Sequence, residues 1–311
     1  MNQIKIGLVI LAALLAASSV LAREVMDFDG GWRFALGDPA GAQSVDHQDA
    51  SWRVLSVPHD WAFEADYAED AAQGGQGGYK PGGIGWYRKS FELSEGWVGK
   101  RVTVAFDAVY MNCEMWINGH YLGKRPYGYI SFEYELTKYL KPGENVIAVR
   151  VDNSREPSAR WYHGCGIYGH VKLLATDAVY IPRDGIFVRT PEITDVSAQV
   201  VVETELSSIL PSAPDATLVT EILDPDGKVV AEVTAQAKTG TTVKQTLSVP
   251  RPMRWDIDTP HLYKVISRVS AGEYRDEVTT RFGIRDIQWK KDTGFWLNGR
   301  VVKLKGVADH S

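Results

Sequence analysis

The sequence predicts an all-β protein built from two consecutive β-sandwiches, and three observations support this fold class. Apolar and polar residues alternate with a period of two over several runs, which is the pattern of strands that bury one face. Asn-Gly and Pro-Gly pairs stand between such runs, where they favour tight turns. No run of comparable length carries the period of an amphipathic helix.

Composition narrows the class of protein further. The 311 residues suffice for about two domains. Hydrophobic residues make up 44% and charged residues 23%, which is ordinary globular usage and excludes disordered, collagen-like and coiled-coil proteins. The 34 basic and 39 acidic residues give a net charge of −5, and no basic run marks a phosphate-binding face. We therefore expect no nucleic-acid partner.

Residues 1–22 have the form of a secretory signal peptide. Lys5 precedes an apolar run over 6–17, and Val20-Leu21-Ala22 ends in the small residue that a signal peptidase reads, so we expect cleavage before Arg23. The alternative is a membrane anchor, but the run is shorter than the ~20 apolar residues that a spanning helix needs. The sequence thus predicts an exported protein, periplasmic or extracellular, with no membrane contact after cleavage.

The first zone, 23–175, is rich in aromatic residues and reads as a β-sandwich or jelly roll. Residues 101–108 alternate as a half-buried strand, and 113–117 repeat the pattern. Asn118-Gly119 predicts a tight hairpin after the second of these runs, and 144–151 predict a further strand after a Pro-Gly turn.

The second zone, 176–284, has the same alternation with few aromatic residues. Residues 198–206 and 243–249 predict strands, and Asp224-Pro225-Asp226-Gly227 predicts a turn. The length suits an immunoglobulin-like sandwich, although the Cys…Trp…Cys core of antibody domains is absent. No candidate chemistry stands out in this zone, so we interpret it as a spacer.

The third zone, 285–311, is too short for a domain. Phe295-Trp296-Leu297 and 301–305 flank Asn298-Gly299, which predicts a second Asn-Gly hairpin.

A series of short motifs runs along nearly the whole mature sequence, at 28–34, 57–61, 83–89, 106–110, 116–119, 125–129, 149–154, 160–162, 166–168, 282–285 and 304–307. In residues and in order, these motifs resemble those of glycoside hydrolase family 2, the family of β-galactosidases, β-glucuronidases and β-mannosidases. They are most similar to secreted bacterial β-galactosidase-type members.

The resemblance implies a jelly-roll sugar-binding domain, an immunoglobulin-like domain and the start of a truncated (β/α)₈ barrel, whose first strand would be 302–307. A retaining glycosidase needs two carboxyl groups about 5 Å apart. In the family both are glutamates on later barrel strands, the acid/base within an Asn-Glu pair, and this sequence contains no Asn-Glu dipeptide. We therefore nominate no catalytic residue and expect this chain alone to be inactive.

The resemblance makes the chain the N-terminal part of an exported retaining β-glycosidase, with a β-glycoside as substrate. A stand-alone carbohydrate-binding module and a purely structural pair of sandwiches are the alternatives. The preferred sugar stays open between galactose, glucuronate, mannose and others. Without neighbouring barrel strands, residues from about Lys290 onward would expose strand edges, so we expect them to be mobile or to drive self-association.

Four residues are candidate substrate contacts on the strength of the resemblance. His310 stands where the family usually has a histidine that lines the sugar pocket, and its alternative is a histidine at a frayed terminus. Asp309 stands where relatives often have Asn or Arg, which makes a direct sugar contact by it more doubtful. Arg160 and Trp161 lie in the segment that relatives direct toward the barrel mouth, where a Trp face can stack on a sugar; Trp161 could equally be a core residue. We expect no cofactor and no metal.

Two further features have open interpretations. His59-Asp60 could suggest a metal site or a catalytic dyad, but without a third ligand nearby it favours a structural motif. Cys113 and Cys165 stand where relatives commonly have Ser. Export would allow them to form a disulfide that stabilises by a few kcal/mol, and two free buried thiols are the alternative.

Overall fold

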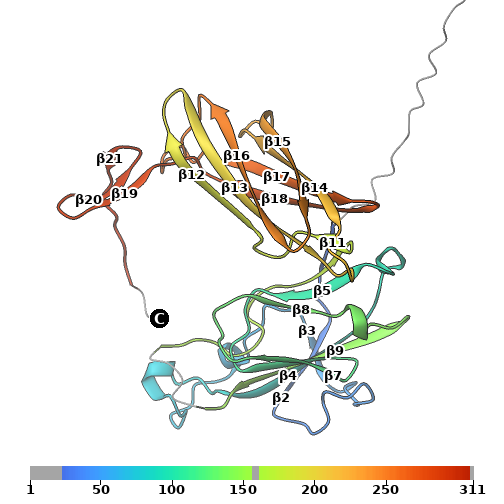
Figure 1. Ribbon diagram of the computed structural model, residues 1–311. Helices are drawn as coiled ribbons and strands as arrows, with labels where there is room; N and C mark the ends of the chain where they lie inside the picture. The colour runs from blue at the N-terminus through green and yellow to red at the C-terminus, as the bar shows by residue number, and fades with distance from the viewer. Residues whose placement is uncertain (1–22, 156–160, 309–311) are drawn as a thin grey trace, which may run out of the picture.

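The structure is a computed structural model that describes residues 23–155 and 161–308, and it confirms the all-β fold class (Figure 1). Two sandwiches follow one another along the chain, and a small sheet follows the second. Within the described residues, no helix is long and apolar enough to cross a membrane.

The first sandwich consists of a four-stranded and a six-stranded antiparallel sheet. The order of the smaller sheet is β1 (Arg23–Asp27), β10 (Val171–Thr176), β5 (Arg101–Phe106) and β8 (Phe132–Glu135). The order of the larger sheet is β3 (Arg53–Leu55), β2 (Trp32–Leu36), β4 (Gly83–Glu92), β9 (Glu144–Asn153), β6 (Cys113–Ile117) and β7 (His120–Arg125). Four short helical turns lie in the connections: α1 (Trp61–Glu64), η1 (Gly74–Gly77), η2 (Glu95–Trp97) and η3 (Thr137–Tyr139).

The core between these two sheets explains the aromatic content of the first zone. Trp32, Tyr87 and Phe106 are fully buried there, and Trp32 packs edge-on against Tyr87 with ring centres 6.5 Å apart. Large aromatic side chains bury much apolar area each, so a few of them fill the space between the sheets.

The strands predicted in the first zone are confirmed as β5, β6 and β9, and the Asn118-Gly119 hairpin joins β6 to β7 with both residues at positive φ. The expectation that β5 is only half-buried is wrong. Thr103 and Ala105, on its supposedly polar face, are also buried. The reason is that this face of the sheet meets the second sandwich, and period-2 alternation does not reveal contacts between domains.

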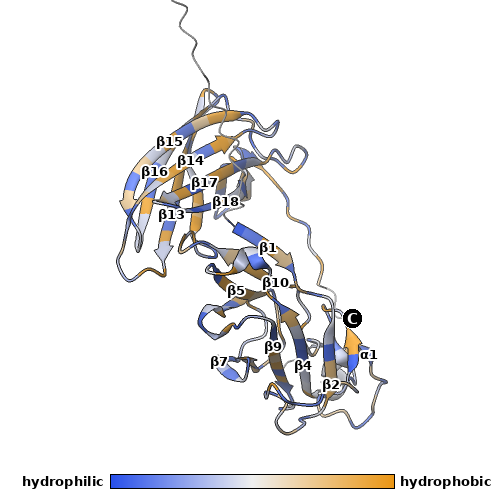
Figure 2. Ribbon diagram, turned by 90° about the vertical axis from the view of Figure 1, so that its right-hand side faces the viewer, coloured by the Kyte–Doolittle hydropathy of each residue, from blue (hydrophilic) through white to orange (hydrophobic). Residues whose placement is uncertain are grey.

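The second sandwich is the immunoglobulin-like domain. One sheet contains β11 (Val179–Tyr180), β13 (Ser197–Ser208) and β12 (Ile186–Ile193), with β16 (Thr241–Pro250) on β13. The other has the order β15 (Val229–Lys238), β14 (Asp215–Leu223), β17 (Tyr263–Ala271) and β18 (Tyr274–Phe282). The predicted turn at 224–227 is confirmed between β14 and β15. Figure 2 shows the alternation of apolar and polar residues along these strands.

A buried ion pair joins the two sandwiches. Arg23, in β1, donates from Nε to Asp276 Oδ1 at 3.0 Å and from Nη2 to Asp276 Oδ2 at 2.7 Å. The backbone N–H of Ile181 also donates to Asp276, which is only 1% exposed. The first strand of one domain is therefore tied to the last strand of the other.

The third zone forms a three-stranded sheet of β19 (Ile287–Lys290), β20 (Gly294–Leu297) and β21 (Arg300–Val301). Asn298 and Gly299 both have positive φ, which confirms the second Asn-Gly hairpin. Residues 302–307, expected as a first barrel strand, are not a strand, because a parallel strand needs neighbours that the described residues do not supply. Val307 is 98% exposed. The mobility expected for this segment stays a prediction.

Both cysteines are buried and neither is in a disulfide, so the proposed bridge is wrong and the alternative of two buried thiols holds. Cys113 is in the core of the first sandwich, and burial raises its pKa to about 12. The Sγ atom of Cys165 accepts a hydrogen bond from Asn153 Nδ2 at 3.0 Å.

Candidate functional site

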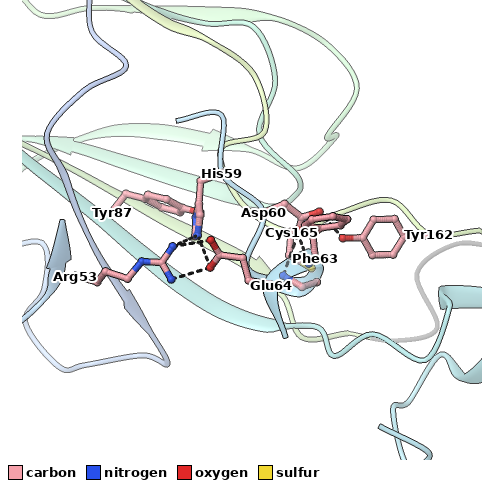
Figure 3. Close-up of polar contacts among 9 residues, drawn as sticks. Arg53, His59, Asp60, Phe63, Glu64, Tyr87, Tyr162 and Cys165 are labelled. Carbon is pink, nitrogen blue, oxygen red and sulfur yellow. Dashed lines mark hydrogen bonds and ion pairs between the residues drawn. The ribbon is translucent and has the colours of Figure 1, made fainter. Parts of the chain in front are cut away.

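The candidate site lies at the end of the jelly roll that carries α1, and Asp60 organises it (Figure 3). Asp60 caps α1 by accepting from the N–H of Ala62 at 3.0 Å and of Phe63 at 3.3 Å. Its carboxylate also accepts from the N–H of Cys165 at 2.8 Å and from the Tyr162 hydroxyl. A short carboxylate before a helix is a favourable cap, and here it also fixes the segment that follows Trp161.

His59 belongs to a second network on the other side of the Asp60 backbone (Figure 3). Its Nδ1 lies 2.7 Å from the Tyr87 hydroxyl, and its Nε2 lies 3.3 Å from both Glu64 Oε2 and Arg53 Nη2. Burial lowers the pKa of His59, and the hydrogen bond from Arg53 lowers the pKa of Glu64 to about 2. The imidazole is therefore neutral near pH 7, while Glu64 is held as an ion pair.

This arrangement supports the structural interpretation of His59-Asp60. Glu64 is occupied by Arg53 and Asp60 by three backbone amides and a phenol, so neither carboxylate is available as a catalytic base. Among the residues that the structure describes, no group of three or more His, Cys, Asp or Glu side chains is placed to hold a metal ion.

Gly166 occupies a position beside His59 and Tyr87 where only glycine fits. Its φ is +126°, and a Cβ atom there would lie 2.3 Å from the Tyr87 hydroxyl oxygen and 2.7 Å from the carbonyl oxygen of His59. Both contacts are far shorter than van der Waals packing allows, so only glycine permits the 164–167 segment to lie against His59.

An exposed aromatic face extends from this framework, and we define it as Tyr127, Tyr129 and Trp161. These side chains are 57%, 45% and 47% exposed. Trp161 Nε1 donates to the Tyr129 hydroxyl at 3.0 Å, and the rings of Tyr127 and Tyr129 are 5.6 Å apart. Trp161 is therefore not a core residue.

Buried groups support the aromatic face from behind. The Tyr110 ring is buried. Its centre lies 5.3 Å from that of Tyr129 on one side, and it stacks on His163 with ring centres 4.3 Å apart. Gln73 donates to the Trp161 carbonyl at 3.4 Å and lies 3.2 Å from His163 Nε2. Held rings offer an apolar surface with hydroxyl groups at its rim, which suits a ligand that is apolar on one side and polar at its edge.

Trp161 is the one predicted contact residue that the structure describes. Arg160, Asp309 and His310 lie outside the described residues. Sequence reasoning missed Tyr127 and Tyr129 as partners of Trp161, although the run Arg125-Pro126-Tyr127-Gly128-Tyr129 was a visible signal. It also missed the bonds from Tyr162 and Cys165 to Asp60, which join residues about a hundred positions apart in the chain.

Comparison with family models identifies the two sandwiches as parts of a glycosidase architecture. Residues 25–177 match the model described as glycosyl hydrolases family 2, sugar binding domain, and residues 179–285 match that of glycosyl hydrolases family 2. The chain belongs to glycoside hydrolase family 2.

Several relatives match along almost the whole chain. It is 43% identical to a putative β-glucuronidase of Formosa agariphila over 97% of its length, and 44% identical to the β-galactosidase BoGH2A of Bacteroides ovatus over 96%. The chain spans only 29% and 36% of these two relatives. A solved family 2 member from Bacteroides cellulosilyticus has a TM-score of 0.86 and 36% identity, with 90% of this chain and 38% of that chain covered.

Proposed function

We propose that this chain is the N-terminal, non-catalytic part of an exported retaining β-glycosidase, β-galactosidase-like, that hydrolyses O-glycosidic bonds in carbohydrates. One observation carries the proposal: a sugar-binding domain and a second family 2 domain follow in order over residues 25–285. The names of the relatives, β-galactosidase and β-glucuronidase, support a β-glycoside as substrate and leave the sugar open between these two.

The proposal places the catalytic carboxyl pair outside this chain. Retaining chemistry needs an acid/base and a nucleophile about 5 Å apart across the bond that breaks. At the candidate site, the Asp60 carboxylate caps α1, and the Glu64 carboxylate is paired with Arg53. We therefore expect the purified chain to leave p-nitrophenyl β-galactoside and β-glucuronide unhydrolysed above background. Hydrolysis that disappears when an acidic residue between 23 and 308 is replaced would contradict the proposal.

Within the whole enzyme, the aromatic face would contribute to the sugar site. Figures 1 and 2 both show that residues 302–308 run from the second sandwich toward the α1 end of the jelly roll, on the side where the candidate site lies. Trp161 would then stack on the apolar side of a sugar ring.

Replacing Trp161 tests this role on the chain itself. We expect Trp161→Ala to weaken the binding of methyl β-D-galactopyranoside or methyl β-D-glucuronide at this face by roughly tenfold, which corresponds to ~1.4 kcal/mol. Chemical-shift titration of the ¹⁵N-labelled chain would measure it. Trp289→Ala is the matched control, because Trp289 is also exposed but lies in β19. Equal effects of the two substitutions would argue against a role for Trp161.

A stand-alone carbohydrate-binding module is the second candidate, favoured by the exposure of all three rings of the aromatic face in this chain. The gene sequence beyond the codon for Ser311 separates the two. Continued coding that includes an Asn-Glu pair supports the glycosidase, and an immediate stop supports the module.

Export is part of the proposal and rests on Lys5, the apolar run 6–17 and the small residues before Arg23. N-terminal sequencing of the protein recovered outside the cytoplasm should start at Arg23. A mature chain that still begins at Met1 would contradict export by this route.

A further inference from the structure

The two Asn-Gly pairs of the chain are chemically reactive as well as turn-forming. In such a pair the backbone nitrogen of the glycine can attack the carbonyl carbon of the asparagine side chain, because glycine has no Cβ to hinder the approach. The sequence contains two of them, Asn118-Gly119 and Asn298-Gly299. Both form hairpins with positive φ at each residue, so the surroundings of the pairs decide which one reacts first.

The reaction needs water and no other reagent. The Gly299 nitrogen loses its proton and bonds to Cγ of Asn298, and the Cγ–Nδ2 bond breaks, so that ammonia leaves. The five-membered succinimide ring then takes up a water molecule and opens at either of its carbonyl groups. One opening gives aspartate, and the other gives isoaspartate, which adds a methylene group to the backbone. Nothing is oxidised or reduced.

Hydrogen bonds restrain the Asn298 side chain while its hairpin is closed. Nδ2 donates to the Trp255 carbonyl oxygen at 2.9 Å and to Asp256 Oδ2 at 3.2 Å, and Oδ1 accepts from the Asp286 N–H at 3.1 Å. Ring closure requires the side chain and the peptide that follows it to rotate out of the turn, and these bonds oppose that rotation. The rate of reaction therefore depends on how often the hairpin opens.

The sheet that contains Asn298 has little to keep it closed. All residues of β19 and β21 are exposed, and Leu297 is the only buried residue of the three strands. Figure 1 shows this small sheet at the side of the second sandwich. In contrast, β6, which precedes Asn118, lies within a six-stranded sheet and buries Met115 and Ile117 in the core. Segments with few buried apolar contacts open most easily, so Asn298 should be released more often than Asn118.

Water can reach the Asn298-Gly299 pair. A cavity of about 310 Å³ lies between the second sandwich and the hairpin, and both residues of the pair line it together with Arg254 and Asp286. A polar cavity of this size has room for several water molecules. The water that opens the succinimide ring is therefore available at the site.

Conversion would remove the anchor of the sheet. An ionised aspartate has acceptors only, so at position 298 it would lose both donated hydrogen bonds and would face the Asp256 carboxylate. Arg300 is already paired with Asp256 and Asp258. Isoaspartate would in addition lengthen the two-residue loop and disturb the pairing of Leu297 with Arg300.

We propose that Asn298 is a site of spontaneous modification, which converts to aspartate or isoaspartate before Asn118 does, and that the conversion releases the β19-β20-β21 sheet from the second sandwich. Because water does not restore the amide, released molecules would accumulate as the protein ages. The proposal needs only the described residues, so it stands apart from the assignment of the whole enzyme.

The experiment incubates the chain in mildly alkaline buffer, which favours loss of the glycine N–H proton. Peptide mapping by mass spectrometry measures the conversion of both pairs in the same sample. We expect Asn298 to convert about tenfold faster than Asn118, which corresponds to ~1.4 kcal/mol in the free energy of local opening. Hydrogen exchange in the fraction converted at Asn298 should show lost protection at Leu297 and unchanged protection at Met115.

Two variants connect these results to the hairpin. Asp256→Ala removes one partner of Asn298 Nδ2, so it should speed the conversion of Asn298 and leave that of Asn118 at the wild-type rate. Asn298→Gly has no amide to lose, so its protection at Leu297 should not change further with incubation. Equal conversion of the two pairs, or faster conversion of Asn118, would overturn the proposal. Converted chains that keep full protection at Leu297 would overturn it as well.

Discussion

Single polar side chains at the α1 end of the jelly roll connect segments that are far apart in sequence. Asp60 alone binds the first turn of α1, the Cys165 amide and the Tyr162 phenol. Burial and the hydrogen bond to Asp60 together raise the pKa of Tyr162 well above its usual range, so the phenol keeps its proton and remains a donor. The rigidity of the backbone behind Trp161 thus depends on a few charged contacts.

His59 makes the stability of this end sensitive to pH. Its ring packs beside Phe34, faces Tyr87, Glu64 and Arg53, and burial lowers its pKa below the ordinary value of about 6.5. The unfolded chain therefore binds more protons than the folded chain as the pH falls below 6.5. The free energy of unfolding should decrease over that range.

The test compares this pH dependence in wild type and His59→Gln. Urea unfolding between pH 7.5 and 5 should give a flatter dependence for the variant, because glutamine does not titrate. His120→Gln replaces an exposed histidine and should keep the slope of the wild type. A slope unchanged by His59→Gln would show that other groups dominate this range.

The side chain of the asparagine anchors both Asn-Gly hairpins to their surroundings in the same way. In each, the asparagine side chain accepts from one backbone amide and donates to one backbone carbonyl of the adjacent structure. For Asn118 these are Val146 N at 2.9 Å and Tyr139 O at 2.9 Å. For Asn298 they are Asp286 N at 3.1 Å and Trp255 O at 2.9 Å. The asparagine therefore both permits the turn and anchors it to its domain.

Removal of the Asn298 anchor should release the β19-β20-β21 sheet without unfolding the sandwiches. Asn298→Ala loses the bonds to Asp286 and Trp255, so local opening should become easier by roughly 2 kcal/mol, about a 30-fold loss of amide protection. Hydrogen exchange at Leu297 and Val302 would measure this. Asn298→Gly keeps the positive-φ turn without the side-chain anchor and should lose about as much. Protection unaffected by Asn298→Ala would mean that the sheet is held by other contacts.

Strands and turns could be predicted from the sequence because they depend on neighbours a few residues apart. Alternation located β5, β6, β9, β13 and β16, and Asn-Gly located both hairpins. Contacts between distant segments leave no such pattern. The burial of Thr103 and Ala105 against the second domain, the grouping of Tyr129 with Trp161, and the lack of a bridge between Cys113 and Cys165 all depend on how whole sheets and loops approach each other. The family resemblance named Trp161 as a contact, but only the structure shows that its ring is exposed.

At the scale of the whole molecule, a largely buried ion pair contributes to the junction between the two domains. Arg23 is the residue at which the mature chain is predicted to begin, and its guanidinium binds both oxygens of Asp276 and the carbonyl of Ile181. Arg275 donates its backbone N–H to Asp177 at 2.9 Å beside it. These hydrogen bonds tie β1 and residue 177 to the start of β18 at the junction between the sandwiches.

Replacement of Arg23 should uncouple the domains. Arg23→Ala leaves the Asp276 carboxylate buried with only the Ile181 and Glu277 amides as partners, and loss of one member of a buried pair costs about 3 to 5 kcal/mol. We expect the wild type to unfold in a single calorimetric transition and Arg23→Ala in two, with the immunoglobulin-like domain unfolding at the lower temperature because it holds the orphaned charge. Asp276→Asn, which removes that charge, should restore part of the loss when combined with Arg23→Ala. Arg268→Ala breaks two partly exposed ion pairs within the second domain, to Glu221 and Glu277, and should cost at most about 1 kcal/mol for each. If Arg23→Ala behaved like Arg268→Ala, the junction would be held by packing rather than by the buried pair.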